Sequence, residues 1–118
     1  MGVRLVSIGD GVSELELVVE PHHLNPGGIV HGGIIATILD AAIGIALRTQ
    51  LPRSQSHVTV QLDVRYFAPA RGGALIARGN AVQSGGRIAF GDGELRTDDD
   101  QIVAKATGTF LAVTRSDE

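Results

Sequence analysis

The sequence predicts an α+β domain in which a long antiparallel β-sheet wraps around one central α-helix. With 118 residues the chain is long enough for one domain, residues 1–118, that buries about two-thirds of its unfolded surface. Segment 30–49 carries the one long helical pattern, and short β-prone segments stand on both sides of it. A helix of roughly 30 Å matches strands of about ten residues at about 3.3 Å each.

The elements follow from turn signals along the chain. Gly9-Asp10-Gly11 separates β-prone runs and predicts a hairpin, and the loop 21–28 contains two histidines, Asn-Pro and Gly-Gly. The helix is apolar on nearly every face, which is typical of a buried helix, and Pro52 with the polar residues after it should end it. Strands are expected at 3–8, 14–19, 58–67, 74–83, 87–96 and 102–113, with a turn at 84–86, and the tail 114–118 should fray.

Two strands have faces made of small residues. One face carries Ala89, Gly91, Gly93 and Leu95, and the next strand carries Ala104, Ala106, Gly108 and Ala112. Small residues at alternate positions let another element approach the sheet closely, although the glycines could instead mark β-bulges. In segment 58–67, strict alternation places the apolar side chains on one face and Thr59 on the opposite, polar face.

Composition excludes several classes of protein. The net charge is −3 without a basic cluster, which argues against a nucleic-acid partner. The absence of cysteine excludes disulfides and thiolate metal sites, and the histidines lack metal-ligand spacing, so we expect no metal site. The apolar run 34–47 has 14 residues and is too short to span a bilayer, and residues 1–8 do not resemble a signal peptide. We expect a cytoplasmic protein that does not act at a membrane.

Asp40 lies in the middle of the apolar helix. A buried carboxylate must be neutralised, paired or used. Its catalytic uses are those of a general base or of a nucleophile on an electrophilic carbon. The alternative is a structural carboxyl group that is protonated or hydrogen-bonded to a neighbour.

The sequence His31-Gly32-Gly33 stands where the helix begins. The first N–H groups of a helix have no intrahelical acceptor, and together with the helix dipole they suit an oxyanion or a carbonyl oxygen. Glycine lets a substrate come close to the main chain. A glycine-rich helix start without a ligand is the alternative.

The spacing of these two features predicts a dimer. Asp40 follows Gly32 by eight residues, so the two lie about 12 Å apart along the helix. An acyl carbon must lie about 3 Å from both its nucleophile and its oxyanion donors. One helix cannot satisfy both, but two antiparallel helices from two subunits can, which predicts a homodimer with two sites at its interface. The sequence contains no nucleophile elbow, phosphate-binding loop or dinucleotide fingerprint.

Other polar residues are weaker candidates. Asn25 could orient a water molecule or hold a carbonyl group, or simply form a turn. His31 could line the site or hold the loop, and Thr59 could contact a water molecule or be an ordinary strand threonine. Three arginines could meet phosphates or be solvated surface charges: Arg65, Arg71 and Arg87.

The pattern Asn25…Gly28-Ile-Val-His-Gly-Gly…Thr37…Leu39-Asp40 resembles the signature of the PaaI-type hotdog-fold acyl-CoA thioesterases. The segments 58–70 and 104–110 are similar to later strands of that family, so the resemblance spans essentially the whole chain. It implies the hotdog fold, and dimers or dimers of dimers (homotetramers) with sites between subunits.

The resemblance also implies roles. Asp40 would be the nucleophile or general base, and the Gly32 N–H of the partner subunit would polarise the thioester carbonyl. Asn25 would place the thioester or the water, His31 would support the loop, and Thr59 would hold the water. CoA would be part of the substrate rather than a cofactor, with its phosphates near the surface arginines Arg65, Arg71 and Arg87.

The predicted activity is hydrolysis of small or medium acyl-CoA or aryl-CoA thioesters. Water could attack directly, or Asp40 could form a transient mixed anhydride. An enoyl-CoA hydratase or dehydratase on the same fold is an alternative, although loop 21–30 lacks the acid that such enzymes place beside a histidine. A non-catalytic acyl-CoA binding module is the third possibility.

Overall fold

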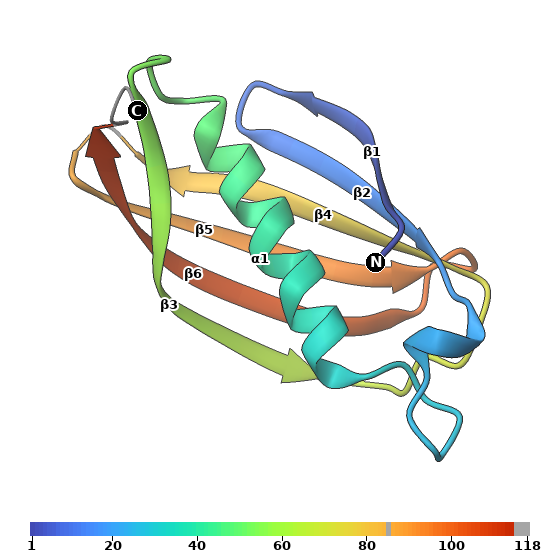
Figure 1. Ribbon diagram of the computed structural model, residues 1–118. Coiled ribbons are helices and arrows are strands. Elements are labelled where there is room, and N and C mark those ends of the chain that lie inside the picture. The colour runs from blue at the N-terminus through green and yellow to red at the C-terminus, as the bar shows by residue number, and fades with distance from the viewer. Residues whose placement is uncertain (85, 115–118) are drawn as a thin grey trace.

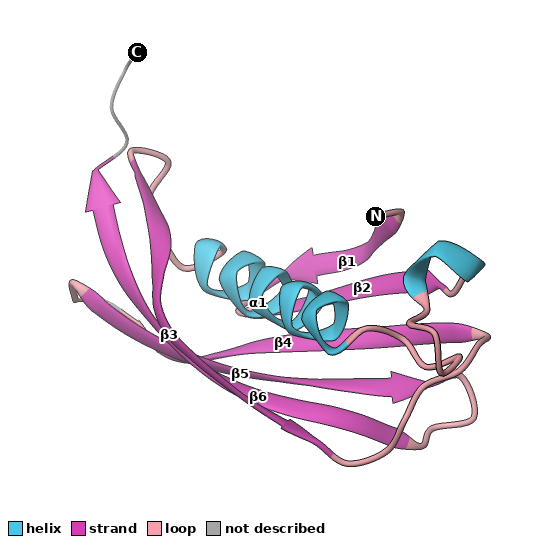
Figure 2. Ribbon diagram, turned by 60° about the horizontal axis from the view of Figure 1, so that its bottom comes forward, coloured by secondary structure: helices cyan, strands magenta, loops and turns pink. Residues whose placement is uncertain are grey.

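The computed structural model describes residues 1–84 and 86–114. One helix, α1 (Gly32–Arg48), lies across the concave face of a curved antiparallel sheet (Figure 1). Figure 2 shows the sheet bending around one side of α1 while the other side of the helix is left uncovered. The predicted α+β architecture of a sheet wrapped around one helix is therefore confirmed.

The sheet has six strands in the order β1-β2-β4-β5-β6-β3, so that β1 and β3 are its edges. The strands are β1 (Val3–Gly9), β2 (Val12–Val18), β3 (Gln55–Tyr66), β4 (Ala74–Gln83), β5 (Ile88–Thr97) and β6 (Ile102–Thr114). Every predicted strand is present, and β3 begins three residues earlier than expected. A single 3-10 turn, η1 (Pro21–His23), lies inside the predicted loop. The middle of the expected turn at 84–86 and the tail 115–118 lie outside the described residues.

Glycines on the inner face of the sheet let α1 sit directly on the strands. A Cβ atom at Gly79 in β4 would lie 2.1 Å from the carbonyl oxygen of Ala42. At Gly91 in β5 it would lie 2.6 Å from Cγ2 of Ile43. The bulges of the sheet fall at other positions, so the prediction that small residues mark a close helix approach is confirmed for β5. The closest approach, at Gly79, was not predicted.

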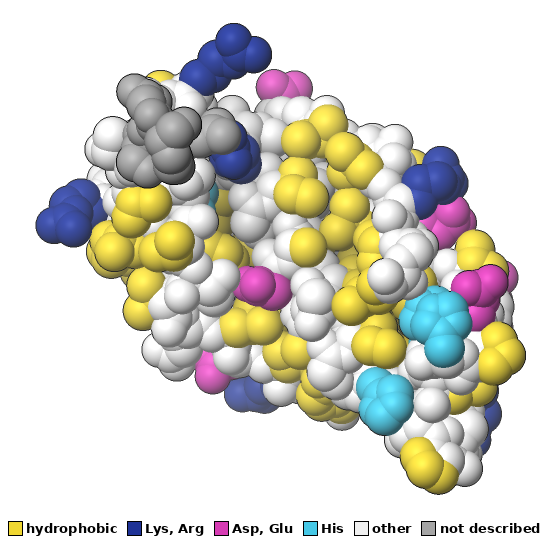
Figure 3. All heavy atoms as spheres, in the orientation of Figure 1, with side chains coloured by type: hydrophobic (Ala, Val, Ile, Leu, Met, Phe, Trp, Pro, Cys, Tyr) yellow, Lys and Arg dark blue, Asp and Glu magenta, His cyan; other side chains and the backbone are white. Residues whose placement is uncertain are grey.

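α1 has one packed face and one open face. The packed face consists of Ile35, Ile38, Leu39, Ala42, Ile43, Ala46 and Leu47. The open face carries the exposed Gly33, Thr37, Ala41 and Arg48, with the half-buried Asp40 between them. Figure 3 views this side of the molecule, where hydrophobic side chains gather over the helix. The expectation of a helix buried all round is wrong for the single chain, because the sheet covers only one side.

A β-bulge in β3 changes which side chains face the helix. Thr59 pairs with Phe110 and Gln61 pairs with Thr109, so Val60 is the extra residue. Thr59 faces α1 before the bulge, whereas Leu62 packs against the core after it. The strict alternation predicted for this strand is therefore wrong at the bulge, because one added residue moves every earlier side chain to the other face.

No helix within the described ranges is long and apolar enough to cross a membrane.

Replacing Gly79 by alanine should destabilise the fold by about 3 kcal/mol, because the added methyl group overlaps the backbone of α1. Gly72→Ala is the matched control, since a Cβ atom there meets nothing within 4 Å. Urea unfolding of both variants measures the difference. Equal stability of the two variants would contradict the close packing of α1 on β4.

Candidate active site

The N-terminus of α1 presents unpaired backbone donors. The carbonyl oxygen of His31 accepts hydrogen bonds from the N–H groups of Ile34 and Ile35, at 3.0 and 3.3 Å. The N–H groups of Gly32 and Gly33 have no hydrogen-bond partner within the described residues. They lie beside a cavity of about 600 Å³ that both glycines line. This end of the helix can therefore receive an oxyanion or a polarised carbonyl oxygen.

Asn25 holds the loop that leads into the helix. Its Oδ1 atom accepts hydrogen bonds from the N–H groups of Gly27 and Ile29, at 2.9 and 3.2 Å. The turn considered for Asn25 in the sequence is therefore present, and the side chain also lines the cavity at the helix N-terminus. Since only Oδ1 is engaged by the loop, the amide NH₂ group is left to donate to a ligand.

His31 contributes through its backbone. It is the N-cap residue of α1, and its N–H donates to the carbonyl oxygen of His23 at 3.0 Å. The His31 side chain is exposed and makes no capping hydrogen bond. His23 is buried and in turn receives the N–H of Glu20 at its Nδ1 atom, at 2.9 Å. The two histidines thus support the loop, and the His31 ring does not line the cavity.

Tyr66 supports the same turn and was not identified from the sequence. Its hydroxyl group donates a 2.6 Å hydrogen bond to the carbonyl oxygen of Gly32. The hydroxyl also lies 3.3 Å from the position that a Cβ atom at Gly32 would take. The last residue of β3 therefore fixes the first residue of α1. The alternating pattern of the strand placed Tyr66 among core residues and hid this contact.

Asp40 has a hydrogen-bonding partner across the helix–sheet interface. The Thr59 hydroxyl donates to Oδ1 of Asp40 at 2.8 Å. Both residues line a cavity of about 280 Å³ between α1 and β3. The carboxylate is half-buried on the open face of the helix, so it is paired and still accessible from the cavity. A carboxylate held in this way can act as a general base or as a nucleophile.

His57 lies in the cavity of Asp40 and Thr59. Its ring meets Phe110 edge-on, with centroids 6.0 Å apart. Burial, and secondly the positive charge of Arg48, lower the pKa of His57 from its usual 6.5. The sequence argues against metal ligation by His57 and assigns it no other role. Residues 1–84 and 86–114 contain no group of three metal-ligating side chains.

The cavities at Gly32 and Asp40 share no lining residue. The two residues stand eight positions apart on one regular helix, which corresponds to about 12 Å along its axis. A single chain therefore cannot bring the free N–H groups and the carboxylate to one acyl carbon.

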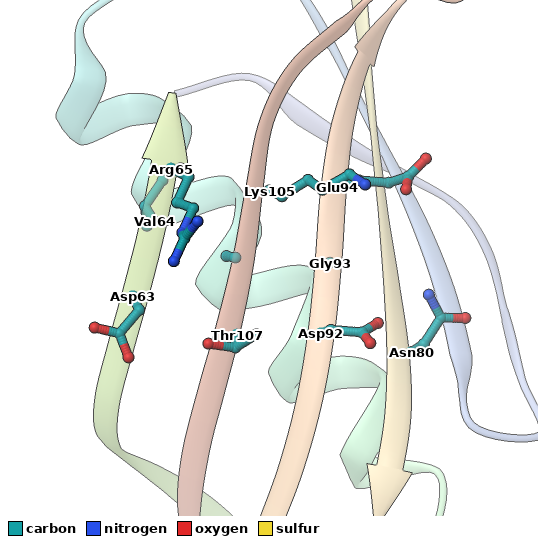
Figure 4. A pocket seen from close by; sticks show the side chains of 10 residues that line it. Asp63, Val64, Arg65, Asn80, Asp92, Gly93, Glu94, Lys105 and Thr107 are labelled. Atoms are coloured by element: carbon teal, nitrogen blue, oxygen red, sulfur yellow. The ribbon is translucent and has the colours of Figure 1, made fainter. Parts of the chain in front are cut away.

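None of the three candidate arginines lines the cavity of Asp40. Arg65 lines a hollow of about 640 Å³ on the outer face of the sheet, opposite α1, with Asp63 and Lys105 (Figure 4). Arg71 is exposed directly after Ala70, which lines the cavity at the helix N-terminus. Arg87 is exposed just before β5. Arg71 is therefore the candidate whose chain neighbour, Ala70, lines the cavity at the N-terminus of α1.

Comparison with known proteins assigns the chain to a family. The sequence matches the thioesterase superfamily over residues 27–104. It is 31% identical to acyl-coenzyme A thioesterase 13 of Homo sapiens over 93% of this chain and 74% of that protein. A Bacillus halodurans protein solved with CoA is 39% identical, with a TM-score of 0.82 over 85% of this chain and 66% of that one. A Streptococcus mutans protein bound to acetyl-CoA is 27% identical, with a TM-score of 0.89 over 98% and 91%.

The fold is the hotdog fold predicted from the resemblance, here with one helix on six antiparallel strands. The chain belongs to the thioesterase superfamily and is a thioester hydrolase.

Replacing Arg48 by glutamine should raise the pKa of His57, because a positive charge that opposes protonation is removed. Arg48→Lys keeps the charge and should leave the pKa low. An NMR titration of the His57 ring measures both. An unchanged pKa in Arg48→Gln would contradict this electrostatic contact.

The lowered pKa also has a consequence for stability. Between the folded pKa and 6.5, the unfolded chain binds more protons at this residue than the native protein does. The free energy of unfolding should therefore be unaffected by His57 above pH 6.5. It should decrease as the pH drops below that value, because the unfolded chain takes up a proton that the folded protein does not.

Proposed function

We propose that this chain hydrolyses small to medium acyl-CoA or aryl-CoA thioesters to a free acid and CoA, with Asp40 as nucleophile or general base. The observation that carries the proposal is the hydrogen-bonded pair of Asp40 and Thr59 in a cavity on the open face of α1. In the reaction a water oxygen bonds to the acyl carbon and the C–S bond breaks. One proton of the water passes to Asp40 and then to the CoA thiolate. If Asp40 attacks first, the C–S bond breaks as the CoA thiolate leaves. Water then cleaves the resulting anhydride, which releases the acid, restores the Asp40 carboxylate and supplies the proton for the thiolate.

The catalytic unit in this proposal is a twofold dimer. The open faces of two antiparallel α1 helices would meet, so that Gly32 of each chain lies beside Asp40 of the other. The Gly32 N–H would then polarise the thioester carbonyl, and Asn25 would help to place the thioester. His31 would keep the loop in position through its backbone. The twelve-residue edge strand β3 offers unpaired backbone groups beside that face, which favours pairing with a second copy.

CoA enters as part of the substrate, and no cofactor is required for this chemistry. Similar proteins have been solved with CoA and with acetyl-CoA, which supports the choice of an acyl-CoA. Exposed arginines would bind the CoA phosphates. Arg71 is the leading candidate, and Arg65 and Arg87 are the further candidates. Association of two dimers into a tetramer and action in the cytoplasm complete the proposal.

Asp40→Asn should lower kcat for thiol release by about 1,000-fold or more, because the amide cannot accept the proton or attack the acyl carbon. Binding of the acyl-CoA should persist. A thiol-detecting dye and equilibrium binding measure the two effects. Asp63→Asn, on the outer face of β3, is the matched control and should keep full activity. Unchanged thiol release by Asp40→Asn would overturn the proposed function.

Mixing two inactive variants should restore activity if each site combines two chains. Gly32→Pro removes one N–H at the first helical position, where proline is well accepted, and should lower kcat by about 100-fold. When it is refolded together with Asp40→Asn, about half of the dimers are heterodimers, and each heterodimer has one complete site. The mixture should therefore show about one quarter of the wild-type activity.

The control for this experiment is Gly32→Ala, which adds the same contact with Tyr66 but keeps the N–H. A mixture that stays inactive would contradict a site shared between two chains.

A further inference from the structure

His57 has two polar atoms that the fold leaves unsatisfied. Both ring nitrogens, Nδ1 and Nε2, are buried and have no hydrogen-bond partner within the described residues. Buried polar atoms are nearly always paired, and exceptions often mark functional positions. The ring lies beside the cavity of about 280 Å³ that also contains the Asp40–Thr59 pair.

The surroundings of His57 do not supply the missing partners. On the side of β6, Phe110 meets the ring edge-on, and Ala112 pairs with His57 in register; neither residue titrates. On the side of α1, the charged groups that line the cavity are Asp40 and Arg48. Apart from Thr59, the remaining lining residues are apolar or lack a polar side chain: Ala41, Gly44 and Ile45. Within the described residues nothing that lines the cavity pairs with the ring, so its partner has to come from outside this part of the chain.

Besides Arg48, the polar side chains of Asp40, Thr59 and His57 line this cavity. Thr59 gives its one hydroxyl proton to Asp40, so its oxygen can still accept a hydrogen bond. His57 precedes Thr59 by two residues on the same side of β3, before the bulge, which corresponds to about 6.6 Å along the strand. A water molecule between the two can reach the Thr59 hydroxyl directly, whereas the buried nitrogens of His57 come within reach of it only after a turn of the ring. An ordered water needs two to four polar partners.

We propose that His57 is a positioning residue that hydrogen-bonds the hydrolytic water beside Asp40 and Thr59. This inference rests on the proposed function. It holds for either chemical route, because water attacks the thioester in one and the anhydride of Asp40 in the other.

The electrostatics of the pocket suit this role. Burial and the charge of Arg48 lower the pKa of His57, so its ring is neutral at neutral pH. A neutral imidazole offers one N–H donor and one nitrogen acceptor, whereas an imidazolium only donates. His57 can therefore accept one proton of the water in a hydrogen bond, which helps to turn the oxygen lone pair toward the acyl carbon. In the direct route Asp40 accepts the other proton.

The test compares His57→Phe, which keeps a flat ring without nitrogens, with His57→Gln, which keeps a donor and an acceptor. We expect His57→Phe to lower kcat by about 10- to 100-fold and to leave KM within about twofold, since a lost water contact affects the chemical step. His57→Gln should recover most of that loss. His22→Phe, at an exposed histidine outside the cavity, is the matched control and should behave as wild type.

Three results would overturn the inference. One is an unchanged kcat in His57→Phe. Another is a raised KM at constant kcat, which would mean that the ring contacts the acyl group instead of the water. The third is an equal loss in His57→Phe and His57→Gln with unaltered melting temperatures, which would mean that only the shape of the ring matters.

Asp40→Asn assayed in parallel separates the two proposals. If it is inactive while His57→Phe is fully active, only the role of His57 fails. If Asp40→Asn releases thiol at the wild-type rate, the proposed function fails.

Discussion

The contact between α1 and the glycine-lined face of β4 and β5 is the constraint on which the rest of the structure depends. At Gly79 the helix backbone lies where a side chain would otherwise stand. This seats the helix deep in the concave sheet, with its aliphatic side chains packed underneath. Because the helix sits so close to the strands, side chains at its flank reach β3 directly. The hydrogen bond from Thr59 to Asp40 is one result.

The bulge in β3 is the second feature that shapes the site. Before the bulge, His57 and Thr59 turn toward the flank of α1 and form the polar cavity. After it, Leu62 and Val64 join the core, and Tyr66 reaches the first turn of the helix. Because of this one extra residue, a single strand contacts the carboxylate of Asp40, the hydrophobic core and the N-terminus of α1. Without it, the residues on one side of the bulge would face away from α1.

Each chain carries both halves of the proposed hydrolytic site but holds them apart. The free N–H groups of Gly32 and Gly33 and the carboxylate of Asp40 belong to one rigid helix, and no loop movement can bring them together. Membership in the thioesterase superfamily supplies the reaction class, and the geometry supplies a reason for self-association. In the proposed dimer, the open face of α1 and the edge strand β3 would form the interface. The helix N-terminus of one chain would then lie beside Asp40 of the other.

The sequence by itself determined the order of the elements, the single long helix and the small-residue face of β5, and it singled out Asp40 and the His-Gly-Gly turn as candidates. These features rest on local patterns such as periodicity, turn residues and a charge in an apolar run. Only the tertiary structure decided that one side of α1 is open, that Thr59 faces Asp40, that Tyr66 contacts Gly32 and that His57 lines the cavity of Asp40. Strand curvature, a bulge and cross-strand register set those contacts, and they depend on residues far apart in the chain.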